Sequence, residues 1–197
     1  MVDNAAEADL LRKASHGDEG AFLEIYERHR TPVFRFAARM LGSTTLAEDV
    51  TQECFLSVIR KPEMYRPEGA SLRTYLCAAA RHVALRHLRR RGVEVTADAI
   101  PDGPPDPPGA EEPLQRLIDE EAGEAVRRAV EALPPLQREA LVLFEYEEMN
   151  LTEIATVAGC DVGTVKSRLH RARERLRRTL APWLEAAAAP PCKEARP

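Results

Sequence analysis

The stretch LTEIATVAGCDVGTVKSRLH, residues 151–170, decides the fold of the C-terminal half of this chain. Its pattern predicts two helices joined by a tight turn. Asn150 can cap the first helix, and Glu153, three residues later, completes a capping-box pair. Gly159 stands where the chain must turn, because glycine adopts left-handed backbone angles without steric cost. Asp161 can then cap the second helix.

The second of these helices combines an apolar stripe with a polar, basic face. Apolar residues repeat at alternating spacings of three and four, which marks a buried helix face; they are Val162, Val165, Leu169, Ala172 and Leu176. The remaining positions include Thr164, Lys166, Ser167, Arg168 and Arg171. This layout predicts a helix-turn-helix, whose second helix lies in the major groove of DNA. The alternative is an ordinary helical hairpin with a solvated basic face.

The composition favours an all-α protein. The 197 residues allow one or two domains, and 44% hydrophobic residues suffice for packed cores. The net charge of -4 conceals a segregation, because residues 81–91 carry five arginines and no acid while residues 92–112 carry six acids and no base. Local charge therefore says more about nucleic-acid binding than the whole-chain charge does.

We expect two small helical domains joined by a flexible, acidic, proline-rich linker, with the helix-turn-helix in the second domain. The linker is residues 92–113, whose six prolines and six acids oppose helix formation and leave little to bury. The first domain is then residues 1–91 and the second is residues 114–187. Residues 188–197 are expected to form a disordered tail.

Capping residues and prolines divide these domains into helices. The first domain should hold helices over about residues 5–16, 18–30, 32–41, 46–61 and 72–91. Pro32 suits the first turn of the third of these. Thr45 and Glu48 suit a capping box for the fourth, and Ser71 suits the cap of the fifth. In the second domain, Pro135 can start the helix that precedes the helix-turn-helix.

Several protein classes are excluded by the pattern. No apolar run approaches the length that spans a bilayer, and the acidic N-terminus is not a secretory signal, so we expect a cytoplasmic protein without membrane insertion. The four cysteines form no CxxC pair and no metal-ligand spacing with the histidines, so neither a metal nor another cofactor is expected. No catalytic constellation appears either, and an enzyme is not expected.

Two surfaces of the first domain could bind partners. Asp49, Gln52 and Glu53 form an acidic and amide patch, which is either a solvated face or a docking site for a basic groove. The helix over residues 72–91 ends in more arginines than the helix dipole alone explains, and these suit DNA phosphates. The loop before it, with Tyr65 and Arg66, could hold an unstacked base.

Together these segments resemble bacterial RNA polymerase sigma factors of the extracytoplasmic-function (ECF) type. The resemblance rests on AEDVTQECFL (residues 47–56), on SLRTYLCAAARHVALRHLRRR (71–91) and on the segment over residues 132–178 that contains GTVKSRLHRAR. It implies a transcription initiation factor that binds core RNA polymerase and reads the -35 and -10 promoter elements. It also implies an anti-sigma factor as a partner.

The resemblance further implies a role for each surface, by position. The residues that would bind core polymerase are Asp49, Gln52, Glu53 and Phe55. Those that would contact the -10 element are Tyr65, Arg66, Ser71, Arg73, Arg81, His82 and Arg86. Those that would read the -35 element are Thr164, Lys166, Ser167, Arg168 and Arg171.

Two other hypotheses stay open at this point. The chain could be a stand-alone helix-turn-helix regulator with an N-terminal dimerisation or sensing module, although such a protein has no need of the patch around Asp49. It could also be a hydrolase that pairs Cys54 or Cys77 with a histidine.

Overall fold

The computed structural model describes residues 4–95 and 120–188, which form helices and the turns that join them, without a β-strand in these two ranges. This confirms the all-α prediction. The predicted linker lies outside the described residues from residue 96 onward, as does the predicted tail from residue 189.

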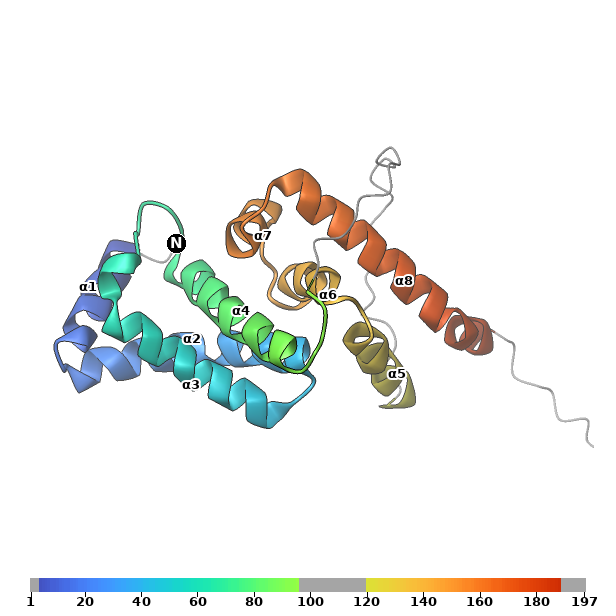
Figure 1. The fold of residues 1–197 in the computed structure, drawn as a ribbon, viewed down its shortest axis with the longest axis horizontal. Coiled ribbons are helices and arrows are strands. Elements are labelled where there is room, and N and C mark those ends of the chain that lie inside the picture. Colours follow the sequence, from blue (N-terminus) through green and yellow to red (C-terminus); the bar gives the residue numbers. More distant parts are fainter. Residues whose placement is uncertain (1–3, 96–119, 189–197) are drawn as a thin grey trace, which may run out of the picture.

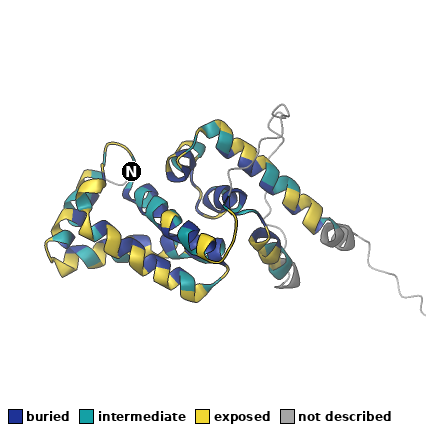
Figure 2. Cartoon of the chain, in the orientation of Figure 1, coloured by how far each residue is buried: buried dark blue, intermediate teal, exposed yellow. Residues whose placement is uncertain are grey.

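Residues 4–95 form the first helical group, whose helices pack around a common core (Figure 1). It consists of α1 (Asn4–Ser15), α2 (Glu19–Leu41), α3 (Thr44–Arg60), the 3-10 turn η1 (Pro62–Met64) and α4 (Leu72–Arg90). Helix α2 packs against α1, α3 and α4, and α3 also packs against α4. Phe36 and Met40 of α2 are fully buried in this core, as are Leu72 and Leu76 of α4. Figure 2 shows the buried faces turned toward one another.

The prediction that Pro32 starts a helix is wrong, because α2 runs through it without a break. Proline removes one backbone hydrogen bond from a helix interior. Here the buried stripe that begins at Ile25 continues through Val33 and Phe36, so packing along the whole helix outweighs that loss. The cap of α3 also differs from the expectation, since Ser43 rather than Thr45 accepts the N–H of Leu46, at 3.3 Å.

The second helical group contains the helix-turn-helix. It consists of α5 (Glu120–Glu131), α6 (Pro135–Leu141), the π-helical turn η3 (Val142–Tyr146), α7 (Leu151–Ala158) and α8 (Val162–Ala188). Pro135 stands in the first turn of α6, as predicted. Helix α8 crosses α5, α6 and α7, and its stripe residues Val165, Leu169 and Ala172 are buried there.

The two groups pack against each other. Helix α4 contacts α7, and α2 contacts η3, α5 and α6; Figure 1 shows the two groups side by side. Arg138 of α6 donates to the carbonyl of Met40 at the end of α2, at 2.6 Å. The guanidinium of Arg39 lies 4.1 Å from the ring centre of Tyr146. This contact between the groups is called the seam below.

Candidate nucleic-acid and protein interfaces

The turn of the helix-turn-helix is built as its sequence predicts. The Asn150 side chain accepts the N–H groups of Thr152 and Glu153, both at 3.0 Å. The Glu153 carboxylate accepts the N–H of Asn150 at 2.9 Å, which completes the capping box. Gly159 ends α7 with φ of 65°, the left-handed conformation that favours glycine. These contacts confirm the first helix and its turn.

Asp161 fixes the start of α8. Its carboxylate accepts the N–H of Thr164 at 2.8 Å and the Thr164 hydroxyl at 2.7 Å. The Thr164 hydroxyl bond is the main reason that the pKa of Asp161 lies below its usual value. A carboxylate at this end of a helix also favours the helix dipole. The first turn of α8 is therefore held firmly relative to α7.

The residues expected to read the -35 element do not all face solvent. Lys166 and Ser167 are exposed, and Thr164 and Arg171 are half-buried. Arg168 is only 9% exposed. Its Nη1 lies 3.7 Å from the Cys160 sulfur. The charge of Arg168 also lowers the pKa of the nearby Glu139 carboxyl, against the effect of burial. The exposed face of this turn thus centres on Lys166 and Ser167, with Arg168 turned toward the domain interior.

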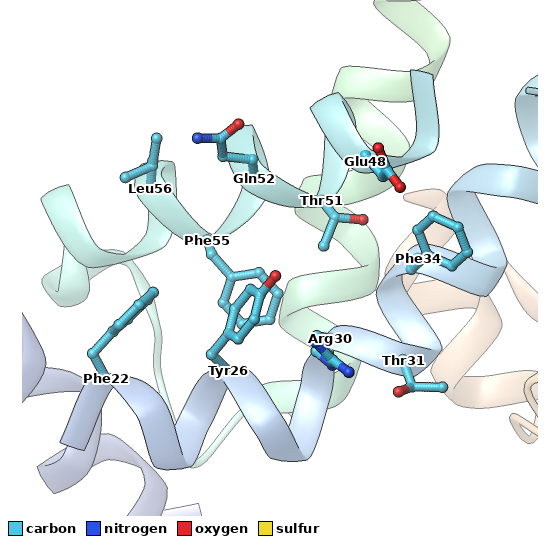
Figure 3. Close-up of a pocket in the computed structure, with 10 residues that line it drawn as sticks. All are labelled: Phe22, Tyr26, Arg30, Thr31, Phe34, Glu48, Thr51, Gln52, Phe55 and Leu56. Carbon is cyan, nitrogen blue, oxygen red and sulfur yellow. The ribbon is translucent and has the colours of Figure 1, made fainter. Parts of the chain in front are cut away.

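The acidic patch on α3 borders an apolar groove. Asp49, Gln52 and Glu53 are exposed, whereas Phe55 is buried at 2% exposure. Phe55 nevertheless lines a groove of about 700 Å³ between α2 and α3 (Figure 3). Its lining residues are Phe22, Tyr26, Arg30, Thr31, Phe34, Glu48, Thr51, Gln52, Phe55 and Leu56.

Aromatic rings give this groove its shape. The rings of Tyr26 and Phe55 meet edge to face with centres 5.0 Å apart, and Phe22 lies 5.7 Å from Tyr26. Leu56 at the rim is 42% exposed, and Leu23 on α2 is 53% exposed. An apolar floor beside acidic side chains is the surface that an amphipathic, basic helix of a partner protein would fit.

The loop between η1 and α4 packs some of its side chains against the first helical group. Tyr65, expected to be free to stack on a base, is only 6% exposed and its ring lies 5.5 Å from that of Tyr75. Burial raises the pKa of Tyr65 to about 12. Ser71 caps α4 by accepting the N–H of Thr74 at 3.2 Å. The exposed member of the expected set in this loop is Arg66.

Three arginines expected to contact the -10 element form ion pairs in the free chain. Arg73 donates to the backbone carbonyl of Glu147, and its Nη2 lies 3.4 Å from the Glu147 carboxylate. Arg81 pairs with Glu139 and Arg86 pairs with Glu53. His82, which lies between Arg81 and Arg86 in the sequence, is exposed.

The structure adds residues that sequence reasoning missed. Glu139 and Glu147 are fully buried at the seam, and Arg35 of α2 also lies 3.5 Å from the Glu147 carboxylate. Burial raises the pKa of both carboxyls, while the arginines beside them act in the opposite direction. Their partners in α2 and α4 stand far away in sequence, so no local pattern could have identified them.

Cys54 and Cys77, the two cysteines of the hydrolase hypothesis, lie in the core. Cys54 and Cys77 are fully buried, and burial raises the pKa of each thiol to about 12. A buried, protonated thiol is a poor nucleophile, which removes the support for the hydrolase hypothesis. Among the described residues, no group of histidine, cysteine and acidic side chains has the arrangement of a metal site. Within the same ranges, none of the helices has the length and apolar character to cross a bilayer.

Family models match both helical groups. The model for sigma-70 region 2 matches residues 25–93, and the model for sigma-70 region 4 matches residues 123–176. Among curated proteins, the chain is 30% identical to the RNA polymerase sigma-H factor of Pseudomonas aeruginosa over 194 residues, covering 95% of this chain and 100% of that protein. It is 30% identical to the ECF RNA polymerase sigma-E factor of Escherichia coli, covering 93% and 99% of the two chains.

A longer relative and two solved structures are also similar. The ECF sigma factor SigE of Mycolicibacterium smegmatis is 35% identical over 170 residues, which cover 84% of this chain and 65% of that protein. The sigma factor RpoE of Bartonella quintana, solved with the anti-sigma factor NepR, superposes with a TM-score of 0.61 at 25% identity, covering 81% and 96% of the chains. CnrH, solved with the cytosolic domain of CnrY, shares the fold with a TM-score of 0.63 at 23% identity, covering 93% and 99%.

Proposed function

The chain belongs to the ECF group of sigma-70 factors, the promoter-specific initiation factors of bacterial RNA polymerase, and from this we propose how its surfaces divide that work. It is not an enzyme, because these factors direct polymerase and perform no chemistry of their own. We assign residues 1–91 to core polymerase and -10 binding, residues 92–113 to the linker, residues 114–187 to -35 binding and residues 188–197 to a tail.

We assign core polymerase binding to the groove between α2 and α3 together with the acidic patch beside it. Asp49, Gln52 and Glu53 supply exposed charge and amide groups at the rim. Phe55 supplies part of the aromatic floor. Fully desolvated apolar contacts surrounded by polar groups are the usual construction of a protein interface, and charge at the rim adds specificity and association rate.

We assign the -10 element to α4 and the loop before it. Arg66 and His82 are exposed and available to DNA, and Arg73, Arg81 and Arg86 carry the positive charge that phosphates require. Tyr65 and Ser71 make contacts within the protein, since Tyr65 packs on Tyr75 and Ser71 caps the helix. We therefore propose that these two side chains position the loop.

We assign the -35 element to the first turns of α8. The observation that carries this assignment is the exposed pair Lys166 and Ser167, held by the Asp161 cap one turn from the start of the helix. The N-terminal residues of a recognition helix are those that reach base edges. Thr164 and Arg171 flank that pair, and Arg168 supports the helix from its inner side.

In vitro transcription tests the function directly. The purified chain is added to core RNA polymerase on a pooled library of bacterial promoters, and the transcripts are sequenced. We expect initiation at a small set of promoters that share one pair of elements. A chain that leaves the transcript pool of core polymerase unchanged would refute the proposal, whatever its affinity for free DNA.

The regulation follows from the same relatives. RpoE of Bartonella quintana and CnrH were each solved with a partner protein, and the partner of RpoE, NepR, is named as an anti-sigma factor. We propose that an anti-sigma factor also binds this chain, and that the chain acts in the cytoplasm, where bacterial polymerase transcribes. Co-purification of the tagged chain from its host, with and without polymerase, tests the first statement.

A further inference from the structure

The seam places buried acids of the second helical group on basic side chains of the first. Glu147 is fully buried, and the arginines that act on its carboxylate are Arg35, Arg39 and Arg73, all from α2 and α4. Arg73 reaches the backbone carbonyl of Glu147 as well as its carboxylate. The buried charge of Glu147 is therefore compensated from across the seam.

The backbone at this point presents Glu147 to the seam. The π-helical turn η3 ends directly before Glu147, whose N–H bonds to the carbonyl of Val142 at 3.1 Å. Glu148 follows with φ of 51°, which is uncommon for a residue with a side chain. Wide helical turns and strained residues of this kind gather at functional positions in proteins.

A second contact repeats the arrangement. Glu139 of α6 is fully buried and pairs with Arg81, whose side chain is 21% exposed. Within the described part of the chain, one oxygen of each carboxylate, Oε2 of Glu139 and Oε1 of Glu147, is buried without a hydrogen-bond partner. Buried charges with incomplete hydrogen bonding stabilise a contact less than their distances imply. These two ion pairs therefore hold the seam together less strongly than their short distances suggest.

We propose that Arg35, Arg73 and Arg81 form one phosphate-binding surface with two exclusive occupants. In the free chain the carboxylates of Glu139 and Glu147 occupy it, and in the initiation complex the DNA backbone replaces them. This assigns Arg35 to the DNA-binding set and makes separation of the two helical groups a condition for binding there. The inference rests on the proposed role of α4 in DNA binding.

Geometry and charge support the exchange. A carboxylate and a phosphate are both anions that accept hydrogen bonds from a guanidinium in the same fork geometry. The three arginines lie at the edge of α2 and α4 that faces the second group, and two of them keep 48% and 38% of their side chains exposed. Phosphate oxygens can reach these guanidinium groups once the acids have moved away.

The test compares single-residue variants of the full chain without polymerase. The probe is a fluorescent single-stranded DNA of 20 nucleotides with random sequence, and binding is followed by anisotropy at low salt. Glu147→Gln keeps the shape of the side chain and removes the charge that occupies the surface. We expect binding about three- to tenfold tighter, because a larger fraction of the chain is competent to bind.

Matched controls separate the seam from net charge. Glu145→Gln removes the same charge two residues earlier, from a side chain that pairs with Arg173 of its own helical group at 2.8 Å. We expect it to bind the probe like the unaltered chain. Tyr146→Ala changes no charge and removes the contact with Arg39. Because Tyr146 is 36% exposed, the variant should fold, and we expect it to tighten binding in the same direction.

Small-angle scattering and a second substitution complete the design. We expect a larger radius of gyration for Glu147→Gln, and we expect Arg35→Ala in that background to weaken binding and reduce the salt slope by about one. Equal affinities for Glu147→Gln and the unaltered chain would overturn the proposal, even with an expanded chain. Failure of the unaltered chain to direct core polymerase would instead overturn the proposed function, which the promoter-library experiment measures separately.

Discussion

Replacing Lys166 by alanine should damage -35 recognition with little effect on folding. The side chain is exposed in the second turn of α8, and alanine is at least as good a helix former as lysine. One good side-chain contact to a base edge contributes about 1–3 kcal/mol of discrimination, which corresponds to about 5- to 150-fold in affinity. A loss in that range is expected for promoter binding by the complete holoenzyme.

The matched control is Arg177→Ala on the same helix. Arg177 stands about three turns further along α8, so it points to the same side as Lys166 but lies about 16 Å away along the axis. The N-terminal residues of a recognition helix are those that reach base edges, so a side chain three turns further along is not expected to contact a base. Arg177 is also 71% exposed and carries the same charge.

Filter binding of holoenzyme to a promoter and to its -35 single-base variants provides the assay. If Lys166 reads a base, its removal should level the affinities of the variants at one position. A uniform loss, with a salt slope lower by about one, would identify a phosphate contact instead. Equal losses for Lys166→Ala and Arg177→Ala would refute the reasoning, since the surface would then respond to charge alone.

Three further changes have expected outcomes. Gly159→Ala should lower the free energy of unfolding by about 1–2 kcal/mol in urea denaturation. The added Cβ meets nothing within 4 Å, so the cost comes from the left-handed backbone alone. Gly159→Asn should cost less, because asparagine tolerates this conformation better than alanine. Asp49→Lys with Glu53→Lys should reduce pull-down of core polymerase without lowering the melting temperature, and unchanged pull-down would remove these residues from the interface. Burial is the main cause that lowers the pKa of His29 despite its 2.8 Å bond to Glu7, so the unfolded chain takes up the proton more readily. Stability should therefore fall as pH drops through about 6.5 and below, and urea curves of His29→Gln should lack that component.

Features governed by neighbouring residues were predictable from the sequence. The cap at Asn150, the turn at Gly159 and the cap at Asp161 each depend on atoms within four residues, so the residue types determine them. The break expected at Pro32 failed because a long buried stripe outweighs one missing hydrogen bond. Local residue preferences determine helix ends where few side chains are buried. Where a long helix face is buried, packing determines whether the helix continues.

Side-chain direction was harder to predict than helix position. Arg168 lies in the expected helix, but its long side chain turns inward beside Cys160. Tyr65 lies in the expected loop, but its ring packs on Tyr75. The seam was missed altogether, because Arg73 and Glu147 are separated by 74 positions in the chain. No periodic pattern connects residues at such separations.

The seam also bears on how parts of related factors could be combined. Across the seam, Arg138 donates to the backbone carbonyl of Met40, and Arg73 donates to the backbone carbonyl of Glu147. A peptide carbonyl is present whichever side chain a relative carries at that position. A chimera that joins the first helical group of one family member to the second group of another should therefore keep these anchors wherever both arginines are retained. The side-chain contacts of the seam, such as Arg81 with Glu139 and Arg39 with Tyr146, would still have to be matched between the two halves.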